Sequence, residues 1–154
     1  MGRRCNVADS TDCVFCRIVR GEAPALVVAE TRLSLALLDL QPLAAGHCLV
    51  ISRRHEAWWH DLTAEETTDL FGLARRVARR IKRAYRPDFV ATYARGRRIP
   101  HVHLFLVPSF AGDPVDRHFN ALEGWQEGAG TLAALAEPAR RAEVAARLAA
   151  IDDD

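Results

Sequence analysis

Residues 101–108 carry the side chains best suited to chemistry, in the order His-Val-His-Leu-Phe-Leu-Val-Pro. Side chains alternate across a β-strand, so His101, His103 and Phe105 share one face and the aliphatic residues take the other. Imidazole titrates near neutrality and binds metals as the neutral ring, so two on one face suit metal binding or proton and phosphoryl chemistry. The alternative is a half-buried strand whose histidines meet only solvent or a hydrogen-bond partner.

A second candidate site is the pair Cys13 and Cys16. A short helix over residues 14–20 would place both thiols on one face, because residues three apart are neighbours on a helix. Such a pair suits metal or redox chemistry, and tetrahedral zinc would need two further ligands. His55 and His101 are the candidates. An unligated thiol pair is the alternative.

The other two cysteines are Cys5 and Cys48. Four cysteines in a chain of this size without a secretion signal do not indicate a disulfide framework. Cys5 lies in a polar stretch and is expected to be a free thiol. Cys48 lies in an apolar run and is expected in the core.

Size and charge limit the class of protein. A chain of 154 residues with 49% hydrophobic residues fits one domain with a real core. Its net charge of +1 gives no overall field that would attract nucleic acid or a membrane surface. No apolar run is long enough to span a bilayer, and residues 1–11 are too polar for a signal peptide. We expect a cytoplasmic protein with no membrane partner.

Short β-rich runs must hold these side chains in place. Residues 26–29 and 33–38 predict a hairpin, and residues 46–52 and 88–93 predict two further strands. Asp39 ends the hairpin's second strand, where a carboxylate either accepts hydrogen bonds from sugar hydroxyls or merely starts a turn.

One long helix is predicted from Thr63 to about Tyr85. Thr63 and Glu66 form a capping box, and apolar residues recur at helical spacing, so one face packs on the sheet. The opposite face carries Arg75, Arg76, Arg79, Arg80, Lys82 and Arg83. These charges are typical of a solvated face, and the neutral balance of the chain makes nucleic-acid binding the less favoured alternative.

The C-terminal part follows Pro108. Residues 109–130 are rich in Gly and Pro and predict a long loop, a length that indicates a functional or interface role. Residues 137–151 predict a final helix with Pro138 in its first turn.

Several of these motifs together resemble the histidine triad (HIT) superfamily, from about Asp12 to Pro108. The segments that carry the resemblance are Cys13-Val14-Phe15-Cys16, Leu37-Leu38-Asp39-Leu40-Gln41-Pro42, Gly46-His47-Cys48-Leu49-Val50-Ile51 with Arg53-Arg54-His55, and Pro100-His101-Val102-His103-Leu104. The resemblance implies an α+β domain over residues 12–108: an antiparallel sheet, one long packed helix and a short N-terminal helix. Residues 1–11 are expected to be a flexible tail, and 109–154 an extension packed on the same domain.

The resemblance also implies roles for individual residues. His103 falls on the nucleophile that attacks the α-phosphorus of a nucleotide and forms a nucleotidyl-histidine, a role that suits neutral imidazole. Asp39 falls on the aspartate that holds the ribose hydroxyls, and His47 on the histidine that lines the phosphate subsite. The resemblance further implies a two-fold homodimer.

In the zinc-carrying bacterial branch of that superfamily, two cysteines and two histidines bind a structural zinc ion. These positions fall on Cys13, Cys16, His55 and His101. The resemblance therefore supplies the two ligands that the cysteine pair lacked.

Two departures from the pattern matter. The third triad position is Phe105, which can neither donate to a phosphoryl oxygen nor move a proton, and such a donor can be worth ~100- to 1000-fold in rate. The phosphate loop before the strand is shortened to Tyr-Ala-Arg-Gly-Arg-Arg at residues 93–98. Arg97 and Arg98 either replace the missing donors, since guanidinium grips phosphate in a bidentate fork, or are surface charges.

The sequence thus predicts hydrolysis or transfer at the α-phosphate of a nucleotide through His103. The substrate class is a nucleoside phosphoramidate, an acyl-adenylate or a dinucleoside polyphosphate. The alternative is a catalytically impaired nucleotide- or partner-binding protein, because Phe105 replaces the third histidine. A zinc-stabilised nucleic-acid binder is a third and weaker interpretation.

Overall fold

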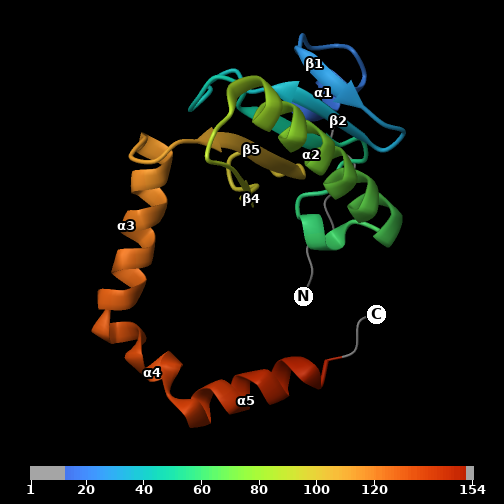
Figure 1. The fold of residues 1–154 in the computed structure, drawn as a ribbon. Helices are drawn as coiled ribbons and strands as arrows, with labels where there is room; N and C mark the ends of the chain where they lie inside the picture. The colour runs from blue at the N-terminus through green and yellow to red at the C-terminus, as the bar shows by residue number, and fades with distance from the viewer. Residues whose placement is uncertain (1–12, 152–154) are drawn as a thin grey trace. The chain divides into compact units, whose positions relative to one another are not determined.

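The computed structural model describes residues 13–151 (Figure 1). The predicted tail at 1–11 and the predicted free thiol of Cys5 lie outside these residues. The described chain divides into two compact units on either side of the bond between Ala111 and Gly112. No helix among the described residues is both long enough and apolar enough to cross a membrane.

The first unit is built on a five-stranded antiparallel sheet in the order β1-β2-β3-β5-β4 (Figure 1). The strands are β1 (Val27–Glu30), β2 (Ser34–Leu38), β3 (Cys48–Ser52), β4 (Phe89–Ala94) and β5 (His103–Ser109). The predicted hairpin is present as β1 and β2. The strands predicted at residues 46–52 and 88–93 are present as β3 and β4. The α+β class is therefore confirmed.

One helix covers each face of this sheet. α2 (Ala64–Tyr85) packs on the face to which Val50, Leu104 and Leu106 point, and the predicted core residue Cys48 is buried there. α1 (Val14–Val19) packs on the other face, with Leu49 and Ile51. Because side chains alternate along β5, its aliphatic residues Leu104 and Leu106 lie on the α2 face, and the residues between them lie on the α1 face.

His103 and Phe105 lie on the α1 face, as the alternation predicted. The predicted strand began at His101, two residues too early, because β5 begins only at His103. His101 lies in a bend just before the strand, where its N–H donates to the carbonyl of Ile99. The next N–H, of Val102, donates to the carbonyl of Glu56 at 2.7 Å, so the chain here is held by the loop after β3.

The start of α2 is held by the predicted capping box. The Thr63 hydroxyl accepts the Glu66 N–H, and the Glu66 carboxylate accepts the Thr63 N–H at 2.9 Å. Arg54 donates two hydrogen bonds of 2.7 Å to the same carboxylate. The Arg54 hydrogen bond, together with those from Thr63, lowers the pKa of Glu66 to about 2.

We expect Glu66→Gln to lower the free energy of unfolding at pH 7 by about 1 kcal/mol, because the amide can keep the capping hydrogen bond but loses the charge that accepts two hydrogen bonds from Arg54. Because its folded pKa lies below the ordinary 4.5, Glu66 stabilises the fold fully above about pH 4.5. That contribution is lost as the pH falls towards about 2. Urea denaturation from pH 7 to pH 3 measures the effect: the gap between wild type and variant should narrow on acidification. A gap that widens would contradict the assignment. Asp61→Asn, which removes an exposed carboxylate from the same unit, is the control.

The second unit, residues 112–154, contains α3 (Pro114–Gly128), a 3₁₀ turn (Gly130–Leu132), α4 (Ala133–Ala136) and α5 (Pro138–Ala149). The prediction of a loop over 109–130 is therefore wrong for most of its length. Asp113 caps α3 by accepting the Asp116 N–H at 2.7 Å, and Pro114 occupies the first turn, where it is tolerated. The final helix lies where it was predicted, and the packing of 109–154 on the main domain stays a prediction.

Candidate functional site

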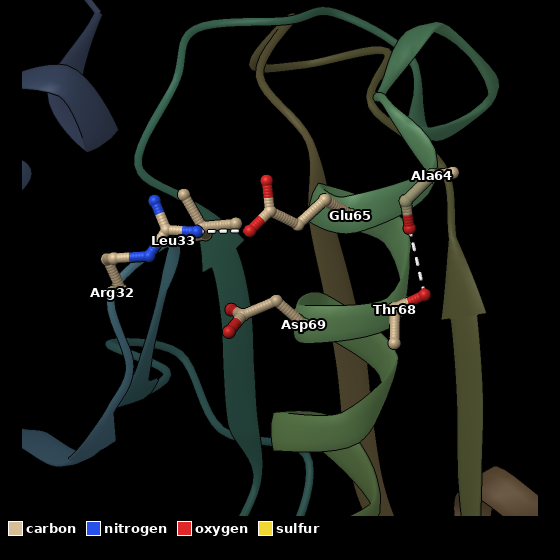
Figure 2. A pocket seen from close by; sticks show the side chains of 6 residues that line it. All are labelled: Arg32, Leu33, Ala64, Glu65, Thr68 and Asp69. Atoms are coloured by element: carbon tan, nitrogen blue, oxygen red, sulfur yellow. Dashed lines mark hydrogen bonds and ion pairs between the residues drawn. The ribbon is translucent and has the colours of Figure 1, made fainter.

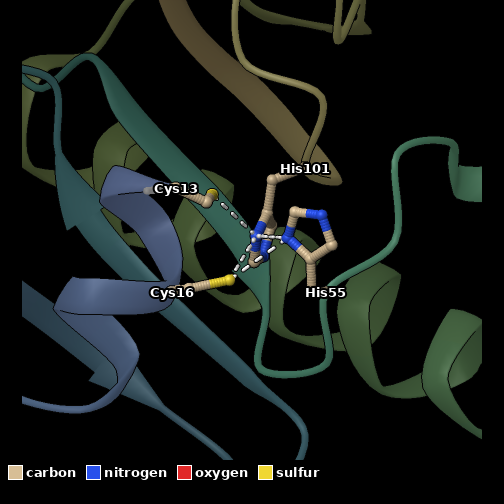
Figure 3. Close-up of side chains that lie close together, drawn as sticks. All are labelled: Cys13, Cys16, His55 and His101. Carbon is tan, nitrogen blue, oxygen red and sulfur yellow. Dashed lines mark hydrogen bonds between the residues drawn. The ribbon is translucent and has the colours of Figure 1, made fainter. Parts of the chain in front are cut away.

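Four side chains that were predicted as metal ligands lie together (Figure 3): Cys13, Cys16, His55 and His101. Their ligand atoms all lie within 4.8 Å of one another. Cys16 Sγ is 3.2 Å from His55 Nδ1, and the two histidine Nδ1 atoms are 3.3 Å apart. The chain brings them from the start of α1, the loop after β3 and the bend before β5. This is a possible metal site with two sulfur and two nitrogen donors, a set that tetrahedral zinc uses.

A hydrogen bond to a backbone carbonyl orients the His101 ring as a metal ligand would need. Its Nε2–H donates to the carbonyl oxygen of Ser52 at 2.8 Å, which leaves the Nδ1 lone pair facing the cluster. Such a hydrogen bond to the outer nitrogen is what fixes a ligating imidazole. Burial lowers the pKa of His101 to about 4, and burial together with neighbouring Cys13 raises that of Cys16 to about 11.

His103 is held by the same segment. Its Nδ1–H donates to the carbonyl oxygen of His101 at 2.6 Å, so Nε2 carries the lone pair. Burial lowers the pKa of His103, which keeps the ring neutral at physiological pH. Phe15 of α1 and Phe105 flank the ring, with centroids 5.1 Å and 5.0 Å away. His103 is thus an oriented, neutral imidazole with one free nitrogen.

His103 lines a cavity of about 480 Å³ on the α1 face of the sheet. The cavity also contains Asp39 and His47, the other two residues predicted for the nucleotide site. Most of its wall is apolar, as expected for a pocket that takes a flat, weakly polar group. The apolar and aromatic lining residues include Phe15, Ile18, Leu37, Leu40, Leu43, Leu49, Ile99 and Phe105.

Asp39 and His47 face each other, with His47 Nε2 3.7 Å from Asp39 Oδ2. The N–H of Leu43 donates to His47 Nδ1 at 3.2 Å, so the proton of the neutral ring is on Nε2. Burial lowers the pKa of His47, against the opposing effect of Asp39. Asp39 Oδ1 accepts the Gln41 N–H at 2.7 Å, so the carboxylate also starts its turn. The turn interpretation of Asp39 therefore holds for Oδ1, while its role as an acceptor for sugar hydroxyls stays a prediction.

A second, smaller cavity of about 290 Å³ contains the predicted residues Arg97 and Arg98 together with Arg95. Tyr93, Arg98, His103 and Phe105 line both cavities. The arginine turn therefore borders the candidate nucleophile.

The sequence did not single out Tyr93 or Phe15. Tyr93 pairs directly with Phe105 across β4 and β5, and the two rings stack at 4.5 Å. Burial, and to a lesser extent Asp39, raises the pKa of Tyr93, so its phenol stays protonated. Only the strand register, which depends on tertiary pairing, brings this ring to the site.

Another hollow, of about 440 Å³, lies between the β1–β2 turn and the start of α2 (Figure 2). Its charged groups already have partners: Arg32 pairs with Glu65, and Asp69 accepts the Thr31 hydroxyl. The Thr68 hydroxyl donates to the Ala64 carbonyl at 2.8 Å. These contacts fasten the β1–β2 hairpin to α2.

Comparisons with known proteins find named relatives and solved structures of similar fold. A protein of Schizosaccharomyces pombe named adenosine 5'-monophosphoramidase is 38% identical over 101 residues, 62% of this chain and 73% of that protein. A namesake from Saccharomyces cerevisiae is 37% identical over 100 residues, and the match spans 61% of its length. The crystal structure of a zinc-bound histidine triad family protein from Mycobacterium smegmatis has a TM-score of 0.62 at 32% identity, covering 68% of this chain and 80% of that one. The HIT domain family model matches residues 20–112, so this chain belongs to the HIT family.

Proposed function

We propose that the protein is a nucleotide hydrolase or nucleotidyl transferase that acts at the α-phosphate through His103. Family membership and the monophosphoramidase relatives support nucleotide hydrolysis. The single observation that carries the finer proposal is the hydrogen bond that His103 Nδ1–H donates to the His101 carbonyl. This bond leaves the lone pair of Nε2 free to attack, in the cavity that also contains Asp39 and His47. Turnover of a nucleoside phosphoramidate by wild type and His103→Ala tests it.

In the proposed reaction Asp39 accepts hydrogen bonds from the ribose hydroxyls, and His47 Nε2–H donates to a phosphoryl oxygen. His103 Nε2 attacks the α-phosphorus, and the bond to the leaving group breaks with its electron pair going to that group. Water then forms a new P–O bond as the P–N bond breaks. His103 recovers its lone pair, and the proton of the water passes to solvent. An acceptor other than water would make the reaction a transfer.

We propose zinc as the ion held by Cys13, Cys16, His55 and His101. Two thiolates and two imidazoles form a closed tetrahedral set, which is typical of a structural site. The zinc-bound relative from Mycobacterium smegmatis supports the choice of metal. When bound, zinc would join α1 to the bend at His101, whose carbonyl oxygen accepts the hydrogen bond from His103 Nδ1.

Phe105 stands where the superfamily pattern has its third histidine, and we expect Phe105→His to raise phosphoramidate turnover. The imidazole would occupy the position 5.0 Å from the His103 ring and supply a donor for the developing phosphoryl charge. The gain is expected to reach ~100-fold, as for other preorganised donors. Steady-state kcat measures it, with Phe105→Leu as the control that removes the ring without adding a donor. A histidine variant no faster than the leucine variant would contradict the prediction.

A specific observation favours the alternative of a nucleotide-binding protein without turnover. Phe105 stacks on Tyr93 and lies 5.8 Å from His47, so an apolar ring fills the space beside both histidines. Nucleotide binding without hydrolysis and without a nucleotidyl adduct would identify this function.

We also expect a homodimer, on the analogy with the superfamily, and no nucleic-acid partner. The edge strands β1 and β4 each leave one side unpaired within the described chain. The arginines of α2 lie on the exposed side of that helix, opposite to the face that packs on the sheet. Analytical ultracentrifugation should give twice the mass of the chain, and oligonucleotides should bind only weakly at physiological salt.

A further inference from the structure

The two histidines of the ligand cluster are held differently. His101 is fully buried, and its Nε2–H donates to the Ser52 carbonyl oxygen at 2.8 Å. His55 is only partly buried, and its outer nitrogen, Nε2, has no hydrogen-bond partner among residues 13–151. A partner on the outer nitrogen of a ligating histidine is typically worth about 10- to 100-fold in metal affinity. His55 is therefore the histidine that would leave a bound ion more readily.

Both thiols of the cluster lie against the histidine rings (Figure 3). Cys16 Sγ is 3.2 Å from His55 Nδ1, and Cys13 Sγ is 3.4 Å from His101 Nδ1. Cys16 is 6% exposed and Cys13 9%, so solvent hardly reaches them while both rings stay in place. His101 can move only with the bend that carries it, whereas the partly exposed ring of His55 can turn outward. An outward turn of His55 would uncover Cys16.

The positions of Cys13 and Cys16 allow a disulfide between them. The Arg17 N–H donates to the Cys13 carbonyl at 3.0 Å, so helical geometry begins at Cys13. Residues three apart on a helix have Cα atoms about 5 Å apart, within the range of about 4.4 to 6.8 Å that disulfides span. Cys48, the other described cysteine, is buried in the core on the opposite face of the sheet. The two ligand thiols are therefore each other's available partners within the described chain.

We propose that Cys13 and Cys16 are a site of reversible oxidation, reached when His55 leaves the ion, at which a peroxide converts the thiol pair to a disulfide and the ion is released. This inference rests on the zinc proposed above and not on the reaction at His103. Thiols that hold a metal ion are deprotonated, and the thiolate is the form that peroxides oxidise. A second thiol beside the first is what turns such an oxidation into a reversible disulfide.

The oxidation proceeds in two steps. The Cys16 thiolate attacks one oxygen of hydrogen peroxide, so that an S–O bond forms, the O–O bond breaks and hydroxide leaves with the electron pair. The Cys13 thiolate then attacks the sulfur of this sulfenic acid, the S–S bond forms, the S–O bond breaks and a second hydroxide leaves. Two electrons have passed from the thiolates to the peroxide. The sulfurs no longer carry the negative charges that hold the ion, and a dithiol reductant restores them.

Release of the ion separates α1 from the bend at His101. Oxidised protein should therefore lose stability in the same direction as chelated protein. Because none of the four ligands lines the cavity that contains His103, the modification acts on the stability of the fold rather than on attack at phosphorus.

Hydrogen peroxide treatment of zinc-loaded Cys5→Ser tests the proposal, because this variant leaves Cys13, Cys16 and Cys48 as the thiols of the chain. A chromogenic chelator should detect one zinc ion released for each disulfide formed. Alkylation under denaturing conditions, followed by intact mass spectrometry, should label all three thiols before oxidation and only Cys48 afterwards. Dithiothreitol with added zinc should restore both the three labels and the bound ion. This measurement needs no variant at a ligand.

His55→Ala tests the route to the thiols. The zinc-loaded variant should be oxidised at least about 10-fold faster than the parent, in line with the weight of an outer-nitrogen partner. His60→Ala, which alters an exposed histidine outside the cluster, should be oxidised at the parent rate. Circular dichroism checks that each variant is folded.

Retention of zinc and of all three alkylatable thiols after peroxide treatment would overturn the inference, as would a disulfide that includes Cys48. Equal oxidation rates in His55→Ala and the parent, or loss of zinc from His55→Ala during purification, would also overturn it, because His55 would then not be the releasable ligand. A purified protein that neither contains nor takes up zinc would refute the zinc assignment together with the inference. Zinc-bound protein that resists peroxide would refute the inference alone. Nucleotide turnover enters none of these measurements, so the proposed reaction at His103 is judged separately.

Discussion

His103→Ala is expected to lower turnover of nucleotide substrates by about 1000-fold or more, because it removes the nitrogen whose lone pair the hydrogen bond from Nδ1 to the His101 carbonyl leaves free in the cavity of about 480 Å³. The protein should remain folded, since His103 contributes one side chain at the wall of a cavity and no core contact on the α2 face. A dinucleoside polyphosphate and a nucleoside phosphoramidate are suitable substrates, followed by chromatography of the released nucleoside monophosphate.

Intact mass spectrometry of rapidly quenched mixtures adds a direct test of the nucleophile. Wild type should show a fraction of protein heavier by one nucleotidyl group, and His103→Ala should show none. His60→Ala is the matched control, because His60 is an exposed histidine that lies against the Trp58 and Trp59 rings and lines neither cavity. Full activity in His103→Ala would remove the proposed mechanism. An active wild type with no adduct would instead indicate direct attack by water.

Loss of the metal is expected to have the largest effect on stability. Cys13→Ser, or prolonged chelation, should lower the free energy of unfolding by on the order of 5 kcal/mol, less than zinc-finger peptides lose, because this chain keeps its own core. For a chain of this size that corresponds to a drop in Tm of roughly 10 to 20 °C. Metal analysis of the purified protein and differential scanning calorimetry measure the two parts of the prediction.

The matched control is Cys48→Ser, which alters a buried thiol in the α2-face core, away from the ligand cluster. It should retain zinc while losing some stability through the buried hydroxyl. Equal zinc content in wild type and Cys13→Ser would contradict the ligand assignment. Because the four candidate ligands do not line the cavity of about 480 Å³ that contains His103, activity per folded molecule should fall less than stability does. A chelated protein with unchanged Tm would contradict the structural role.

Local patterns in the sequence determined much of the framework. Alternation along residues 101–108 placed His103 and Phe105 on one face, because strand side chains alternate whatever the partner strand is. Thr63 and Glu66 marked the start of α2, because a capping box involves only neighbouring backbone groups. The spacing of Cys13 and Cys16 indicated one half of a metal site, and the resemblance to the superfamily supplied the other half.

Other features depended on contacts between distant segments, and only the tertiary structure decided them. The start of β5 at His103 follows from the hydrogen bond between Val102 and Glu56, which local propensity does not contain. The stack of Tyr93 on Phe105 depends on the register of β4 against β5, and a shift of one residue would turn Tyr93 to the other face. The helix at residues 114–128 was missed because Gly and Pro lower helix propensity, while the capping by Asp113 raises it.

At the candidate site, the sequence predicted the residues, and tertiary contacts decided their orientation. The sequence determined which residue types are available: two thiols, four relevant histidines, one aspartate and an arginine turn. It could not determine which nitrogen of each histidine is free, because that depends on carbonyl groups and N–H groups from other segments, such as Ser52 against His101. Nor could it place the arginines beside His103, since Gly96 reaches its position by packing on Trp58. The side chains present determine which chemistry is available at this site. Contacts between distant segments determine which atom of each side chain faces the cavity or the ligand cluster.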